Sequence, residues 1–406
     1  MKSLNRVKRI ASRIVKCDKK SISSKVFKTL SGILKGGAAL LLSRILRRKS
    51  TWLIGETDIT AQDNGYHLFK YVRENYPEKE CYYLLDRKSP DKEKVEMLGN
   101  VVYHGTFKHL LYLFQTEKHI GSHDYRYWHY PGYSKIFSKF FGSFIKGKFI
   151  QIQHGIIHIK SERGFHYDPE KPYDVICVSS QYEKVLLRDH FGHSEEVLKI
   201  TGLCRYDKLE NQEVDEKSII FMPTWRKGLH KKEEFLSSEY YRRIEEFLSD
   251  EGFISLLRTQ GIKLVLYLHV KLQHHSRYFE KYENDVVRVV GLGEESVQEL
   301  IKKGNLMITD YSSVSLDFAY LNKPVLFYQW DFSEYVEGYD VQNPKEYQEM
   351  RFGYICKTKG ELLEHVEEYL LNDFQVNPIH GEKSDLYFEY RDRNNCKRVY
   401  EVIEGL

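Results

Sequence analysis

The 406-residue sequence has few cysteines, and none of them lies in a metal-binding or redox pattern. Its six cysteines include no Cys-x-x-Cys pair. Neither a disulfide framework nor a cysteine-based zinc site is therefore indicated. Cysteines this sparse are typical of a protein whose thiols stay reduced in a cytosol.

The sequence also lacks a long hydrophobic run. The longest unbroken apolar stretch, Gly36 to Leu42, is far shorter than the ~20 residues that a membrane-spanning helix needs. No small-residue cleavage site follows a continuous apolar core, which argues against a secretory signal. We therefore expect neither a transmembrane segment nor a cleaved leader.

Basic charge is concentrated at the amino terminus. Residues 1–50 hold 15 Lys and Arg and one acidic residue, so this arm carries +14 and the remainder −10. Apolar residues recur at helical spacing between the basic ones, for example Leu4, Val7 and Ala11. Helices of this kind lie in the interface of anionic membranes. We predict that the arm attaches the protein peripherally to the cytoplasmic face of the cell membrane. The alternative is a helical hairpin packed on the body.

Residues 51–385 alternate short apolar runs with amphipathic helical segments. This alternation is typical of parallel βαβ units. A polar break at 210–217 divides the series in two. We predict an α/β protein with two Rossmann-like domains, 51–212 and 213–385, and a C-terminal helix in 386–406 that packs back across both.

The segment from Leu306 to Tyr328 reads as a buried strand, a polar elbow, a helix and a second buried strand. The elbow consists of Asp310, Tyr311, Ser312 and Ser313. Unpaired N–H groups and the dipole at a helix N-terminus favour an anion, and ligands of such sheets bind outside the carboxyl ends of strands. We interpret the elbow as the phosphate-holding part of a nucleotide-linked donor site. An ordinary capped helix is the alternative.

A histidine, His154, ends another strand-like run and is followed by Gly155. A histidine at the carboxyl end of a strand can act as a general base, since its pKa lies near working pH. The chain has 17 histidines, so a structural role is the alternative. His158 and His166 lie nearby without the carboxylate spacing of a metal site, and no metal is expected.

Polar residues follow several other predicted strands. Arginine suits bidentate phosphate binding, and a second histidine can stabilise a leaving phosphate. Taken singly, each of these residues could be an ordinary surface or turn residue. They are Arg205, Asp207, Thr224, Arg226, His269 and Asp331.

The order of these motifs resembles that of one family. QHGI, TGxxRYDKL, MPTWR, LxxH and ITDYSSVxxDFAYLxKPVxFY follow one another as in the CDP-glycerol glycerophosphotransferases, which build teichoic acid, capsule-type and related poly(alditol phosphate) polymers. The resemblance extends from Thr51 to the C-terminus. It implies a GT-B-like pair of Rossmann domains facing a central cleft. It also implies a CDP-glycerol or CDP-ribitol donor, whose alditol phosphate passes to a lipid-linked or polymeric acceptor with release of CMP.

The resemblance also assigns roles to residues. It implies that His154 is the base, that His269 and Arg226 contact the donor phosphates, and that Ser312 and Ser313 supply phosphate-binding hydroxyls. No cofactor is expected. No Asp-x-Asp motif stands out to hold a metal between phosphates, and arginine, histidine and a helix N-terminus could carry that charge instead.

Two other functions are compatible with parts of the sequence. A GT-B glycosyltransferase that uses a nucleotide sugar would show the same layout of strand ends. A protein that binds nucleic acid or another anionic polymer would use the basic arm and the many aromatic residues. The acidic body argues against nucleic acid, which needs a basic face on the folded domain.

Overall fold

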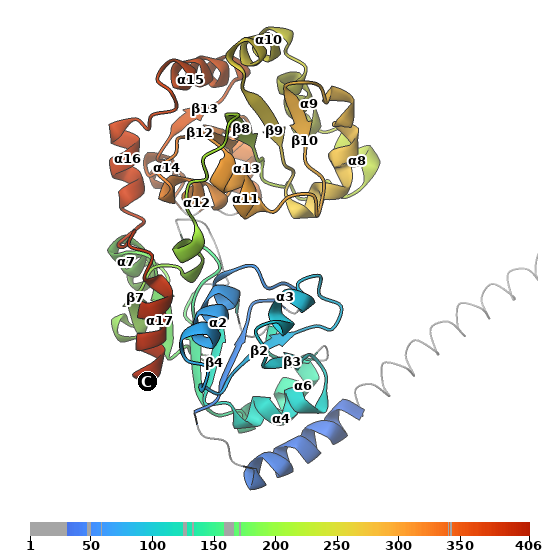
Figure 1. The fold of residues 1–406 in the computed structure, drawn as a ribbon, viewed down its shortest axis with the longest axis vertical. Helices are drawn as coiled ribbons and strands as arrows, with labels where there is room; N and C mark the ends of the chain where they lie inside the picture. The colour runs from blue at the N-terminus through green and yellow to red at the C-terminus, as the bar shows by residue number, and fades with distance from the viewer. Residues whose placement is uncertain are drawn as a thin grey trace, which may run out of the picture. The chain divides into compact units, whose positions relative to one another are not determined.

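A computed structural model describes residues 31–406 apart from 47–49, 58, 125–127, 132–133, 158–165, 170–171, 340 and 342. The described chain forms two compact units, each an α/β structure (Figure 1). The first contains the described residues up to His154, together with Pro169–Cys177 and Cys396–Leu406. The second contains the described residues of 155–168 and Val178–Asn395.

The first sheet has seven strands in the order β3-β2-β1-β4-β5-β6-β7. The order reverses beside β1, as in doubly wound folds. Its strands β1 and β2 are continuous apolar runs that are buried throughout, as expected where helices cover both faces of a parallel sheet. The strands are β1 (Trp52–Gly55), β2 (Cys81–Leu85), β3 (Val101–Tyr103), β4 (Lys118–Gly121), β5 (Lys148–Gln151), β6 (Val175–Val178) and β7 (Leu198–Ile200).

The second sheet has six parallel strands in the order β10-β9-β8-β11-β12-β13. Here the order reverses between β8 and β11, which gives the second unit the Rossmann arrangement that the sequence predicts. The strands are β8 (Ser218–Phe221), β9 (Lys263–Leu266), β10 (Val287–Val289), β11 (Leu306–Thr309), β12 (Val325–Tyr328) and β13 (Tyr354–Cys356).

Several helices begin at a side chain that accepts a hydrogen bond from the first turn, for example Asp63, Ser238 and Thr358. Such caps satisfy N–H groups that have no partner inside the helix. The helices are α2 (Asn64–Asn75), α3 (Lys92–Glu96), α4 (Phe107–Gln115), α6 (Ser134–Phe141), α7 (Gln181–Asp189), α8 (Lys232–Leu236), α9 (Glu239–Leu248), α10 (Glu251–Gln260), α11 (Val297–Lys303), α12 (Val314–Tyr320), α13 (Phe332–Tyr339), α14 (Pro344–Glu349), α15 (Lys359–Leu371), α16 (Pro378–Asp385) and α17 (Asn395–Glu404).

The described part of the predicted arm, residues 31–45, is helical and lies beside α6 in the first unit (Figure 1). Ala39 is buried in a cluster with Phe137 and Phe141 of α6. Gly36 allows this approach, because a Cβ there would lie 2.7 Å from Cε2 of Phe141. Residues 1–30 of the arm lie outside the described residues. Among the helices described, none has the length and apolarity needed to cross a bilayer.

The terminal helix α17 packs on the first unit. Tyr400 stacks on Tyr76 with ring centroids 4.0 Å apart. The Nζ of Lys118 donates a hydrogen bond of 2.6 Å to the carbonyl of Ile403, one of the last carbonyls of this helix. The chain therefore returns to its first unit after completing the second.

Candidate functional site

The carboxyl edge of the second sheet gathers most of the predicted site residues. β8 and β11 lie side by side where the strand order reverses, and β9 and β12 flank them. Thr224 and Arg226 follow β8, His269 follows β9, Asp310–Ser313 follow β11 and Asp331 follows β12. Ligands of doubly wound sheets bind at such a reversal. The structure thus brings residues up to 107 positions apart in sequence to one edge of one unit.

Asp310 joins the loops that follow β8 and β11. Its buried carboxylate accepts hydrogen bonds from the backbone N–H of Tyr311 (2.6 Å) and of Thr224 (2.9 Å). The hydroxyl oxygen of Thr224 is itself buried and has no hydrogen-bond partner within the described chain. The loop after β8 therefore holds a buried hydroxyl that no group among the described residues satisfies.

The elbow ends at the start of α12. The Oγ of Ser312 accepts a 3.3 Å hydrogen bond from the backbone N–H of Val314. Ser313 precedes the helix, but its side chain makes no capping hydrogen bond. A Cβ placed on Gly155, in the same unit, would lie 3.8 Å from the Oγ of Ser313. The glycine after His154 therefore lies beside this hydroxyl.

Arg226 is held between two carboxylates. Its Nη2 lies 2.8 Å from Oδ2 of Asp310, and its Nε lies 2.6 Å from Oδ2 of Asp331. The Tyr311 hydroxyl donates to Asp331 at 3.0 Å, which closes the network. Burial disfavours the charged guanidinium, yet Asp310 and Asp331 hold the pKa of Arg226 above its ordinary value. The charge of Arg226 is thus already compensated, and its contacts fix the elbow in place.

His269 is half-buried at the end of β9 and begins a 3₁₀ helix, η4 (Val270–Tyr278). Its Nδ1 accepts a 3.2 Å hydrogen bond from the N–H of Lys271. Burial, together with the positive charge of Lys271, lowers the pKa of His269 to about 4, and Asp310 partly opposes this shift. The imidazole is therefore neutral at neutral pH. Since Nδ1 accepts, Nε2 carries the proton and can donate a hydrogen bond to an anion.

Arg205 and Asp207 have protein partners in the second unit. Arg205 makes a buried bidentate ion pair with Asp317 of α12, at 3.0 Å and 2.6 Å, and the Tyr206 hydroxyl donates to the same carboxylate at 2.8 Å. Asp207 accepts a 2.8 Å hydrogen bond from the backbone N–H of Asn395. These contacts hold α12 and the start of α17 in place. Donor binding by Arg205 and Asp207 stays a prediction.

His154 lies at the carboxyl edge of the first sheet, after β5. It is exposed, whereas residues 151–153 and 155–157 are buried. Its ring stacks on that of His123, with centroids 4.7 Å apart and an angle of 20° between the planes. The His154 imidazole is therefore accessible to solvent, although the residues on either side of it in the loop are buried.

Three further residues, His123, Asn64 and Asp317, are not among the site residues predicted from the sequence. His123 lies two residues after β4, and Asn64 opens the helix that follows β1. Both positions could be found by reading every polar residue that closely follows a strand in a βαβ pattern. Asp317 does not follow a strand: it lies within α12, its partner Arg205 is 112 residues away, and only its place in the family motif VxxDFAY marks it in the sequence.

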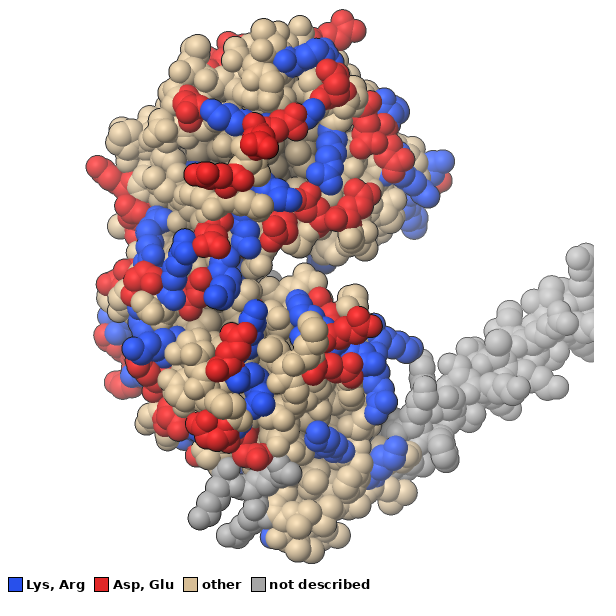
Figure 2. Space-filling model, viewed as in Figure 1, with Lys and Arg blue, Asp and Glu red and all other residues tan. Residues whose placement is uncertain are grey.

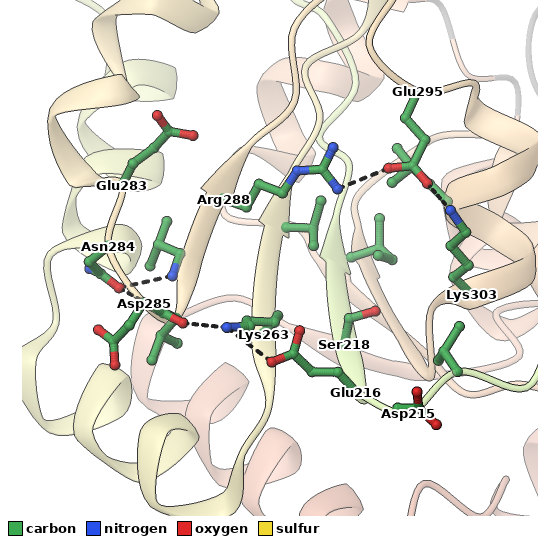
Figure 3. A pocket seen from close by; sticks show the side chains of 16 residues that line it. Asp215, Glu216, Ser218, Lys263, Glu283, Asn284, Asp285, Arg288, Glu295 and Lys303 are labelled. Atoms are coloured by element: carbon green, nitrogen blue, oxygen red, sulfur yellow. Dashed lines mark hydrogen bonds and ion pairs between the residues drawn. The ribbon is translucent and has the colours of Figure 1, made fainter.

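A hollow of about 590 Å³ opens at the other edge of the second sheet, around the amino ends of β8, β9 and β10 (Figure 3). Its three lining cations are Lys263, Arg288 and Lys303, and each pairs with a carboxylate at 2.6–3.0 Å. This hollow therefore lies opposite the edge that carries the predicted site and offers no uncompensated cation to a phosphate.

The described residues show neither a candidate metal site nor, on the face drawn in Figure 2, a candidate nucleic-acid surface. No group of three or more His, Cys, Asp or Glu suited to a metal occurs in the part of the chain that the structure describes. His158 lies outside that part. On the face drawn in Figure 2, acidic and basic side chains alternate over the second unit. That face does not present the continuous basic surface that nucleic-acid binding needs.

Two Rossmann-type parallel sheets of this order define the class of GT-B-like proteins. The wall teichoic acid polymerase TagF has the same fold, with a TM-score of 0.64 and 15% sequence identity over 93% of this chain and 97% of that one. The chain belongs to the CDP-Glycerol:Poly(glycerophosphate) glycerophosphotransferase family, whose model matches residues 38–405. This confirms the resemblance seen in the motifs.

Two relatives from Bacillus subtilis (strain 168) are similar over most of the chain. Identity with the minor teichoic acid biosynthesis protein GgaB is 28% over 373 residues, covering 88% of this chain and 40% of that protein. Identity with a teichoic acid poly(glycerol phosphate) polymerase is 22% over 430 residues, covering 98% and 53%. The chain thus spans about half the length of these relatives.

Proposed function

We propose that this protein transfers glycerol phosphate or ribitol phosphate from a CDP-alditol to a hydroxyl of a lipid-linked or polymeric acceptor and releases CMP. The observation that carries the proposal is the family match over residues 38–405. The names of the relatives support a role in teichoic acid or capsule-type polymer synthesis. A TagF structure obtained after a soak with CDPG supports the donor class.

In the proposed reaction, the acceptor hydroxyl attacks the donor phosphorus that carries the alditol. A new bond forms between the acceptor oxygen and phosphorus. The bond from phosphorus to the bridging oxygen breaks, and CMP leaves with that electron pair. His154 accepts the proton of the attacking hydroxyl, which makes the oxygen a better nucleophile as the bond forms.

The carboxyl edge of the second sheet is proposed to hold the donor phosphates. In this proposal, neutral His269 donates from Nε2, and the hydroxyls of Ser312, Ser313 and Thr224 add further donors to phosphate oxygens. Arg226 contributes by fixing Asp310, and through it the elbow, since its own charge is compensated. Fixed donors stabilise charge on the transferring group without having to reorganise during the reaction.

A donor screen tests the proposed function. The full chain is incubated with CDP-glycerol, CDP-ribitol and UDP-sugars in separate reactions, each with and without a glycerol phosphate oligomer as acceptor. We expect acceptor-dependent release of CMP from a CDP-alditol and no UDP from the sugars. Release of UDP alone would instead identify a GT-B glycosyltransferase. Product size separates the addition of one unit from polymerisation.

We also propose that the helix at residues 31–45 attaches the protein to an anionic membrane. Leu34, Leu41 and Ile45 are 76%, 66% and 77% exposed, and their spacing places them on one face of the helix. The opposite face is the one that packs on α6. An exposed apolar face flanked by basic residues is typical of helices that lie in a membrane interface.

Introducing negative charge on this apolar face tests the attachment. We expect Leu41→Glu combined with Ile45→Glu to reduce co-sedimentation with phosphatidylglycerol vesicles by about tenfold or more, since burying each side chain contributes about 1.5–3 kcal/mol. Leu371→Glu is the matched control, because Leu371 is 90% exposed on α15 in the second unit. Equal sedimentation of both variants would contradict a role for this face.

A further inference from the structure

Asn64 connects the helix α2 to the peptide that precedes His154. It is the first residue of α2 and is completely buried. Its Nδ2 donates a hydrogen bond of 2.7 Å to the carbonyl oxygen of Gln153. Both residues belong to the first unit, as does His154. The contact therefore acts on the peptide immediately before the proposed base.

Gln153 has an unusual backbone conformation. Its φ is +57°, in the left-handed region that residues with a side chain rarely adopt. A non-glycine residue keeps such a conformation only where its surroundings impose it. The turn at Gln153 lets the chain leave the buried strand β5 and expose His154 one residue later. The hydrogen bond from Asn64 is one contact that imposes this conformation.

Asn64 is itself held in a fixed position. Glu56, which follows β1, is buried, and its carboxylate accepts hydrogen bonds from the backbone N–H groups of Gln62 (2.9 Å), Asp63 (2.8 Å) and Tyr66 (2.7 Å). These groups surround Asn64 in sequence. These hydrogen bonds connect the first turn of α2 to the end of β1. The backbone of Asn64 is therefore held in place while its side-chain amide contacts Gln153.

We propose that Asn64 is a positioning residue for His154. Its amide holds the Gln153 peptide in the left-handed conformation, and this sets the direction in which the imidazole leaves the loop. This proposal rests on the proposed function of His154 as base. The contact between Asn64 and Gln153 does not depend on which CDP-alditol is the substrate. Asn64 touches no reacting atom. It acts through the backbone of Gln153.

Substitutions at Asn64 and Gln153 test the proposal in the full chain. We expect Asn64→Ala to lower kcat for CMP release by about 10- to 100-fold, since a displacement of about 1 Å can cost that much, with KM for CDP-glycerol within twofold of wild type. Adding Gln153→Gly should restore part of kcat, because glycine adopts positive φ without steric cost. Asn64→Asp keeps the side-chain volume but replaces the N–H donor by a carboxylate oxygen. It is the variant to measure if Asn64→Ala does not fold.

The matched control is Asn75→Ala. Asn75 ends the same helix, and its amide also donates to a backbone carbonyl, that of Tyr71, at 2.9 Å. We expect this variant to have the wild-type kcat. A kcat within twofold of wild type for both Asn64 variants would overturn the proposal. A loss that Gln153→Gly leaves unchanged would also overturn it, because the effect would then not pass through this peptide.

A second measurement separates this proposal from the proposed function. The Cε1–H resonance of His154 is identified by NMR from its loss in His154→Ala. We expect it to shift in Asn64→Ala and not in Asn75→Ala. If the wild-type chain releases no CMP from any CDP-alditol, the proposed function fails while the resonance still tests the positioning. An unshifted resonance would overturn the role of Asn64 alone.

Discussion

Replacing His154 by alanine is expected to lower kcat for CMP release by about 10²- to 10⁴-fold, the usual contribution of a general base. The imidazole is exposed at the end of β5 while its neighbours are buried, so it is accessible to an acceptor and few core contacts depend on it. We therefore expect the free energy of unfolding to stay within about 0.5 kcal/mol of wild type. Released CMP measures the rate, and urea denaturation measures the stability.

His190→Ala is the control for this substitution. His190 is a second exposed imidazole, at the carboxyl end of α7. We expect it to leave kcat unchanged. Full activity of the His154 variant would remove this residue from the mechanism. An equal loss in both variants would show that any histidine substitution impairs the enzyme, and would contradict a specific role for His154.

The fold could be predicted from the sequence because most of the strands are short apolar runs that alternate with helical segments. In a parallel sheet covered on both faces, such runs need no alternation, so β1 and β11 are visible as short continuous hydrophobic segments. β13 was missed. It contains only three residues, Tyr354–Cys356, of which two are half-buried. A strand so short at the edge of a sheet has no pattern that distinguishes it from a loop.

The placement of the candidate residues at one edge also followed from the sequence, since parallel strands present their carboxyl ends together. The ion-pair partners of these residues could not be predicted in this way. Arg226 appeared from sequence to be available for phosphate, but Asp331, 105 residues further on, and Asp310 compensate its charge. The same holds for Arg205 and Asp317. Ion pairs between distant loops depend on the side-chain packing of the folded state, which local pattern does not encode.

Replacing Arg226 by methionine is expected to lower the free energy of unfolding by about 3–5 kcal/mol, the cost of leaving buried charge without its partner. The side chains of Arg226 and Asp310 are only 11% and 1% exposed, and that of Asp331 is 19% exposed. Without the guanidinium, two carboxylates would face each other at the end of the sheet. We expect donor binding to weaken as well, because Asp310 also orders the backbone of the elbow.

Urea denaturation of two further variants separates burial from pairing. Arg258 makes a bidentate pair with Asp285, with both distances 2.7 Å, but on the surface. Arg258→Met should therefore leave stability nearly unchanged, since water screens exposed pairs. Asp331→Asn, added to Arg226→Met, should recover part of the lost stability because it removes one uncompensated charge. A loss in Arg226→Met no larger than in Arg258→Met would mean that water, rather than Arg226, solvates these carboxylates, and the elbow would then owe its conformation to backbone contacts alone.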